Sequence, residues 1–148
     1  MNKKLKYFLI ACLVGLCTVF GVWQYVHKAP PDNSDKKPDV TFTFPEIMEK
    51  VSKDTASLSQ LKDKIVCMKG CIKKISVDSN STTIEIGDTN SLSCVICQID
   101  SRHQDEFKSC KVLDPIAIQG FMTGYAIDND LGLGNTVEMN FCSQFKNK

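Results

Sequence analysis

The sequence predicts a mainly β domain that follows a single membrane-spanning helix. Three observations carry this prediction. Residues 8–26 form an uncharged, apolar run of 19 residues. From Ile65 onward, apolar residues alternate with polar ones over several short runs, which is the pattern of half-buried strands. Clusters of Asp, Asn, Ser and Gly separate these runs and are typical of turns.

The apolar run has the length and the flanks of a membrane anchor. As an α-helix it spans about 28 Å, close to the ~30 Å hydrocarbon core of a bilayer. Three lysines precede it, and Trp23 and Tyr25 lie near its C-terminal end, where aromatic rings favour the interface. We therefore expect a cytoplasmic N-terminus at residues 1–7, a signal-anchor at 8–26, and export of the remaining chain to a periplasmic or other extracytoplasmic location.

Two processing alternatives compete with an uncleaved anchor. A cleaved signal peptide has a shorter apolar region that ends in small residues, whereas this run continues to Trp23 and Val26. Leu9–Cys12 resembles a lipoprotein processing box, but it would leave a leader of only 11 residues, and we read the match as chance. We favour the anchor and keep cleavage as the alternative.

Residues 27–43 are expected to be a linker, and residues 44–148 are expected to be the folded domain. The linker holds three prolines together with Asp, Asn, Ser and Lys, which favour an extended and solvated chain. Phe44–Lys53 predicts a short helix, because it has a proline in its first turn and apolar residues four positions apart. A further helical turn around residues 55–61 is ambiguous.

Five strands are expected in the domain. The first covers Ile65–Val77, where the apolar residues change parity at Lys73–Lys74 and so predict a bulge or bend. A polar segment at 101–109 predicts a short helix between the third and fourth strands. Gly70 and Gly120 lie in mid-strand, which suits the sharp bending of a small barrel. The remaining strands are expected at Thr82–Ile86, Leu92–Ile99, Ile116–Tyr125 and Thr136–Cys142.

This order of elements matches an OB-fold, a five-stranded Greek-key barrel. Short motifs recur in four of the strands: Val66, Met68, Gly70 and Ile72; Cys97-Gln98-Ile99; Ile116, Ile118, Gly120 and Gly124; and Val137, Met139, Phe141 and Cys142. In this order they resemble the bacterial tRNA-anticodon-like (tRNA_anti-like) OB-fold family of small envelope proteins. The resemblance covers about residues 44–142 and implies the fold, while the family's name suggests nucleic-acid binding by analogy.

Six cysteines lie in the domain: Cys67, Cys71, Cys94, Cys97, Cys110 and Cys142. Disulfides persist in exported domains, but six cysteines allow 15 connectivities. The resemblance implies the pair Cys97–Cys142, because the family pattern supplies these two cysteines and the third and fifth strands of an OB barrel are neighbours. Buried free thiols are the alternative. Cys94-x-x-Cys97 has redox-motif spacing but lies in a predicted strand, so we expect no redox catalysis.

The sequence shows no convergent catalytic, metal-binding or cofactor-binding set. His103 is the one histidine of the domain and lies in a polar turn, where we expect it to be solvated. The cysteine spacing does not suit zinc, and the Asp128–Asp130 cluster lacks the glutamate of a calcium loop. A Gly-rich phosphate loop is also missing. We therefore expect a protein that is not an enzyme and uses neither metal nor cofactor.

The charged and aromatic residues of the domain indicate which ligands it could bind and where. Residues 28–148 carry 15 basic and 17 acidic side chains, which excludes the strongly basic type of nucleic-acid-binding domain. The candidate ligand-binding residues, beside the loop at 126–135, are Lys69, Lys73, Lys74, Phe121 and Tyr125. Phe141 shares parity with inward-facing residues and is expected in the core.

OB-folds bind proteins, oligosaccharides and single-stranded nucleic acids. We expect a binding or scaffolding module of the bacterial cell envelope, held in the membrane by residues 8–26, with a protein or oligosaccharide partner. A single-stranded nucleic-acid-binding protein is the alternative.

Overall fold

The computed structural model describes residues 3–26, 32–79, 81–128 and 132–146, with the backbone alone for residues 3–11. The chain divides into two compact units, Met1–Pro31 and Asp32–Lys148. The first unit contains helix α1 (Lys3–Val26). Among the described residues, no helix is both long enough and apolar enough to cross a membrane. The span expected over residues 8–26 is therefore not confirmed and stays a prediction.

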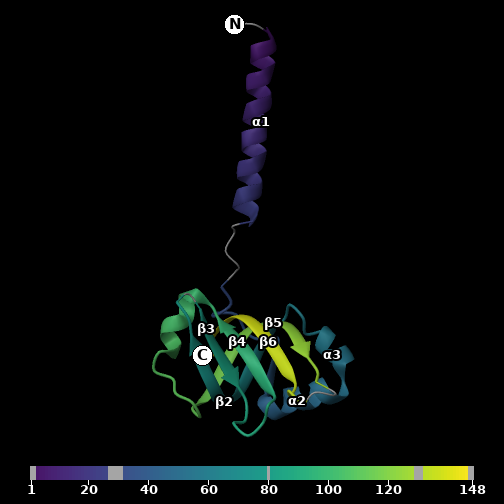
Figure 1. Cartoon of the computed structure of the whole chain (residues 1–148), viewed down its shortest axis with the longest axis vertical. Helices are drawn as coiled ribbons and strands as arrows, with labels where there is room; N and C mark the ends of the chain where they lie inside the picture. Colours follow the sequence, from purple (N-terminus) through teal and green to yellow (C-terminus); the bar gives the residue numbers. More distant parts are fainter. Residues whose placement is uncertain (1–2, 27–31, 80, 129–131, 147–148) are drawn as a thin grey trace. The chain divides into compact units, whose positions relative to one another are not determined.

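The second unit is a closed five-stranded β-barrel (Figure 1). Its strands run in the order β2-β3-β4-β6-β5, and β5 pairs again with β2 to close the barrel. β4 and β6 pair in parallel, whereas the other barrel pairs are antiparallel. This arrangement confirms the predicted OB-fold. The strands are β2 (Ile65–Val77), β3 (Thr82–Ile86), β4 (Cys94–Ile99), β5 (Pro115–Ala126) and β6 (Thr136–Gln144).

The long strand β2 changes neighbours along its length. Its first half, from Ile65 to Cys71, pairs with β5, and its second half pairs with β3. The register shifts between Ile72 and Lys74, as the change of parity at Lys73–Lys74 predicts. The bulge increases the local twist and lets one strand take part in both sides of the barrel.

An additional short strand precedes the barrel. β1 (Val40–Thr43) pairs in parallel with β2, and its Phe42 side chain is part of the hydrophobic core. Before it, residues 32–38, which we call the strap, pack on the barrel. The Gln119 side-chain amide donates hydrogen bonds to the Asn33 and Ser34 carbonyl oxygens at 2.7 and 2.9 Å. Residues 32–43 thus belong to the barrel unit, whereas the sequence predicts a linker over 27–43.

Three short helices complete the unit. They are α2 (Phe44–Lys53), α3 (Thr55–Ser59) and the 3-10 helix η1 (Ser101–Phe107). α2 begins after Thr43, whose backbone N–H and hydroxyl both donate to the Glu46 carboxylate. η1 begins after Asp100, which accepts the Arg102 N–H at 2.9 Å. The helices expected at 44–53 and within 101–109 are confirmed.

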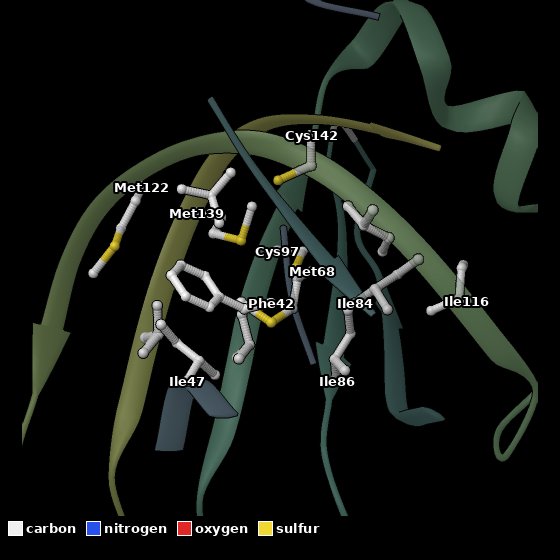
Figure 2. Packing of buried hydrophobic residues seen from close by; sticks show 14 of the residues in the cluster. Phe42, Ile47, Met68, Ile84, Ile86, Cys97, Ile116, Met122, Met139 and Cys142 are labelled. Atoms are coloured by element: carbon white, nitrogen blue, oxygen red, sulfur yellow. The ribbon is translucent and has the colours of Figure 1, made fainter. Parts of the chain in front are cut away.

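The barrel encloses one hydrophobic core, which is rich in Ile and Met side chains. Figure 2 shows Met68, Ile84 and Met139 directed into this space from three different strands. Phe42 from β1 and Ile47 from α2 are part of the same cluster (Figure 2). The inward positions of β2 and β5 are those of the alternating apolar residues in the sequence.

Candidate binding surface

The five candidate ligand-binding residues lie apart on the barrel. Lys69 is opposite Ala117 of β5, whereas Phe121 is opposite Ile65. Four residues of strand separate these two positions, or about 13 Å. Tyr125 lies four residues farther along β5, and Lys73 and Lys74 lie beyond Lys69 on β2. The structure therefore does not bring the predicted set into one site.

Two of the three candidate lysines are held by other barrel residues. The Lys73 ammonium donates to the Ser91 carbonyl oxygen at 2.6 Å, and the Lys74 ammonium lies 3.6 Å from a Glu85 carboxylate oxygen. Lys69 is exposed. These contacts tie the β2 lysines to the β3–β4 side of the barrel and do not create a basic groove around them. In the loop at 126–135, residues 129–131 lie outside the described part of the chain.

The structure exposes a phenylalanine that the sequence places in the core. Phe141 is 42% exposed and has a φ of 52°, in the left-handed region that non-glycine residues rarely adopt. On β5, Gln119 pairs with Ser143 of β6 and Phe121 pairs with Asn140. Phe141 and Cys142 of β6 therefore both lie opposite the single residue Gly120. This β-bulge reverses the parity of β6 and directs Cys142 inward instead of Phe141. The prediction that Phe141 is a core residue is wrong for this reason.

Two aromatic residues, Phe121 and Phe141, lie on the adjacent strands β5 and β6 near the bulge. Ile118 and Met122 of β5 face the core. Since successive side chains of a strand point to opposite faces, Phe121, the residue directly before Met122, faces outward. Phe121 is half-buried and lies opposite Asn140, the residue before Phe141. We call this surface, formed by Phe121, Asn140 and Phe141, the aromatic face. The aromatic face is the candidate binding surface that the structure adds to the predicted residues.

The cysteines of the described chain are free thiols. Cys97 and Cys142 are fully buried on the neighbouring strands β4 and β6, where their thiols interact. Burial and the adjacent Cys97 raise the pKa of the Cys142 thiol. The structure thus brings together the two cysteines of the pair that the family resemblance implies, but it shows no disulfide between them. In the structure they are buried free thiols, which is the alternative prediction. Burial also raises the pKa of Cys94, in β4.

His103 is a partner in an ion-pair cluster and is not simply solvated, as the sequence suggests. Its Nε2 atom lies 3.1 Å from both carboxylate oxygens of Asp32, and its Nδ1 atom lies 3.5 Å from Glu106. Asp32 is 71 positions away in the chain, so spacing could not reveal this contact. Within the described residues, no group of three or more His, Cys, Asp or Glu side chains is placed to hold a metal ion.

The chain matches a known protein family over most of its length. Residues 1–132 match the family model described as tRNA_anti-like. The chain belongs to the tRNA_anti-like family. The matched range of this family member includes α1 as well as most of the barrel. A search of curated proteins finds no match.

Solved structures with a similar fold include two synthetases and a replication protein. Asparaginyl-tRNA synthetase from Pyrococcus horikoshii is 13% identical, with a TM-score of 0.40 over 57% of this chain and 20% of that chain. The Entamoeba histolytica enzyme in complex with asparaginyl-adenylate is 18% identical, with a TM-score of 0.44 over 76% and 25%. A replication protein A heterotrimer bound to ssDNA is 5% identical, with a TM-score of 0.35 over 56% and 58%. Such low similarity carries no argument about function.

Proposed function

We propose that this member of the tRNA_anti-like family is a membrane-anchored binding module of the cell envelope without catalytic activity. In this proposal α1 is the anchor, the barrel is exported, and the aromatic face binds a protein or an oligosaccharide. The observation that carries the proposal is the uncharged and exposed surface of α1. The aromatic face supplies the binding surface.

The described side chains of α1 are exposed and, apart from Thr18 and Gln24, apolar. Every residue from Cys12 to Val26 is exposed, including Leu16 at 74%, and residues 7–26 contain no charged side chain. A helix that is hydrophobic on all sides needs an apolar environment around it, either a protein core or a bilayer. The lysines before residue 7 favour a cytoplasmic N-terminus, which would place the barrel outside the cytoplasm.

A topology reporter tests the orientation. An alkaline phosphatase domain fused after Lys148 should be active, because this enzyme needs the oxidising conditions outside the cytoplasm to form its disulfides. The same fusion without residues 2–26 is the control and should be inactive. An inactive full-length fusion, together with activity of a cytoplasmic reporter at the same position, would contradict the exported location.

The second candidate function is binding of single-stranded nucleic acid. The observation in its favour is the aromatic face, because OB-folds stack bases on exposed aromatic side chains. The excess of acidic residues in the barrel unit and the ties on Lys73 and Lys74 speak against it.

Fluorescence anisotropy with labelled oligonucleotides separates the two functions. We expect no binding at micromolar protein concentration, at either low or moderate salt. If oligonucleotides bind, the second function predicts that Phe141→Ala weakens binding by at least about fivefold, since a stacked base contributes about 1–3 kcal/mol. Leu113→Ala is the matched control, because Leu113 is also exposed and has a φ of 76° but lies outside the aromatic face.

A further inference from the structure

The His103 imidazole joins the strap to the body of the barrel. Its Nε2 atom faces the Asp32 carboxylate of the strap, at 3.1 Å from each oxygen, and its Nδ1 atom faces Glu106 of η1 at 3.5 Å. The His103 side chain is 15% exposed, whereas the Asp32 side chain is 43% exposed, so solvent reaches the strap side of this contact. One histidine thus lies between two carboxylates from segments far apart in the sequence.

A doubly protonated His103 ring can donate to both of these carboxylates. A neutral imidazole has one N–H donor and one acceptor nitrogen, whereas an imidazolium donates from both nitrogens. When His103 is neutral, one of the two carboxylates must therefore face a nitrogen lone pair, and that contact becomes repulsive. Histidine is the side chain whose charge ordinarily changes between pH 5 and 8.

The surrounding charges stay fixed over this pH range. The Ser34 backbone N–H and the His103 ring lower the pKa of Asp32 to about 2. Although burial opposes it, contacts with Lys146 and the Gln144 N–H lower the pKa of Glu106. Asp100 also interacts with His103, but its carboxylate is paired with Arg102. Asp35, Lys36 and Lys37 of the strap line the same cavity of about 450 Å³ as His103. The two carboxylates that face His103 therefore stay charged over this range.

The strap makes other contacts besides its ion pair with His103. Gln119 donates to two strap carbonyl oxygens, and the Lys36 N–H donates to the Asn33 carbonyl oxygen. Beneath the strap, the polar side-chain atoms of Asn33 and the Gln119 Oε1 atom are buried and have no hydrogen-bond partner within the described part of the protein. Buried polar atoms without partners favour opening, because water would solvate them.

We propose that the strap is a pH-sensitive latch, closed on the barrel when His103 is protonated and loosened when His103 is neutral. Release would free seven residues between the barrel and residue 31, which adds up to about 24 Å of reach. This gain in reach matters for binding only if α1 is the proposed anchor. The latch itself depends on the barrel unit alone, so its test is independent of the anchor.

Hydrogen exchange of the full-length protein in mild detergent tests the latch. The reporters are the amides of Lys36 and Asp39, which donate to the Asn33 and Ile65 carbonyl oxygens. After correction for the intrinsic effect of pH on exchange, peptides covering residues 32–39 should exchange roughly three- to tenfold faster at pH 8 than at pH 5.5. A core peptide from β3 should show no such change.

Two variants separate a pH-sensitive latch from a general packing role. In Asp32→Asn, the new amide can donate to the neutral Nε2 atom while Nδ1–H donates to Glu106. The strap should then stay protected at pH 8 and lose its pH dependence. Asp105→Asn is the matched control on η1, since Asp105 pairs with the exposed Lys108, and it should keep the full pH dependence. Equal protection of the wild-type strap at both pH values, or pH dependence that persists in Asp32→Asn, would overturn the proposal.

Discussion

At the residue scale, the backbone of Phe141 decides which side chains of β6 enter the core. With Phe141 in the left-handed region, Met139 and Cys142 both point inward although they are three positions apart. This bulge leaves no room for a side chain at the opposite position of β5, which is Gly120. A Cβ atom on Gly120 would lie 2.5 Å from the Cys142 sulfur and 2.9 Å from the Asn140 carbonyl oxygen. Gly120, Cys142 and Phe141 thus form one structural unit that exposes the aromatic face.

Substitution of Gly120 tests this unit. Gly120→Ala should lower the free energy of unfolding by about 1–3 kcal/mol, because the added methyl group has no room beside the backbone of β6. Gly124→Ala, on the same strand, is the matched control. Its Cβ atom would lie 3.7 Å from a flexible Glu138 oxygen, so the cost should stay within about 0.5 kcal/mol. Equal costs in urea unfolding would contradict the close packing at the bulge.

The two core thiols give a second residue-scale prediction. Cys97 and Cys142 should resist iodoacetamide in the native protein, because both are fully buried and the pKa of Cys142 is raised. The exposed Cys71 should react and serves as the positive control. In denaturant without reductant, mass spectrometry should find Cys97 and Cys142 alkylated as well. A species that keeps both unmodified there would show that they form a disulfide.

At the element scale, the alternation of apolar and polar residues predicts the strands of the barrel, but it does not predict that the strap and β1 pack on them. The helix at Phe44–Lys53 and the strand at Ile65–Val77 have the predicted bounds, because alternation and turn residues act over short distances. β1 was not predictable in this way. It offers only two apolar residues in a proline-rich, charged segment, and it forms because β2 presents an open side at Val66–Lys69.

The candidate site shows the same limit. The chemistry of each side chain predicts a binding role for that residue alone, and the register of β2 on β5 separates Lys69 from Phe121. Alternation predicts that Phe141 faces inward, but alternation holds only until a bulge shifts it. The ion pair of His103 with Asp32 depends on the tertiary fold alone.

The contribution of β1 can be measured through Phe42. Phe42→Ala should destabilise the protein by about 3 kcal/mol, because a ring of the hydrophobic core is removed and leaves a cavity. Lys36→Ala, an exposed change in the neighbouring strap, should cost less than about 0.5 kcal/mol. If urea unfolding shows the same small effect for both variants, residues 32–43 are a linker after all.

At the scale of the whole molecule, the sequence divides into parts with different chemistry. The first 26 residues hold basic side chains and the exposed apolar helix, whereas residues 28–148 have a slight acidic excess. The overall charge of +1 hides this division. A tethered binding domain requires both an apolar helix and a well-packed barrel, and the family match over residues 1–132 includes the helix and most of the barrel.

Flotation with liposomes tests the proposed anchor most directly. Full-length protein should rise with the lipid in a density gradient, because α1 partitions into the bilayer. The double variant Leu16→Lys with Val19→Lys should remain in the dense fractions, since each charge at a helix centre costs about 2.5–3.5 kcal/mol of insertion. Circular dichroism of both proteins would verify that the barrel is folded. Full-length protein that stays in the dense fractions, or a double variant that floats equally well, would contradict a membrane-anchored module.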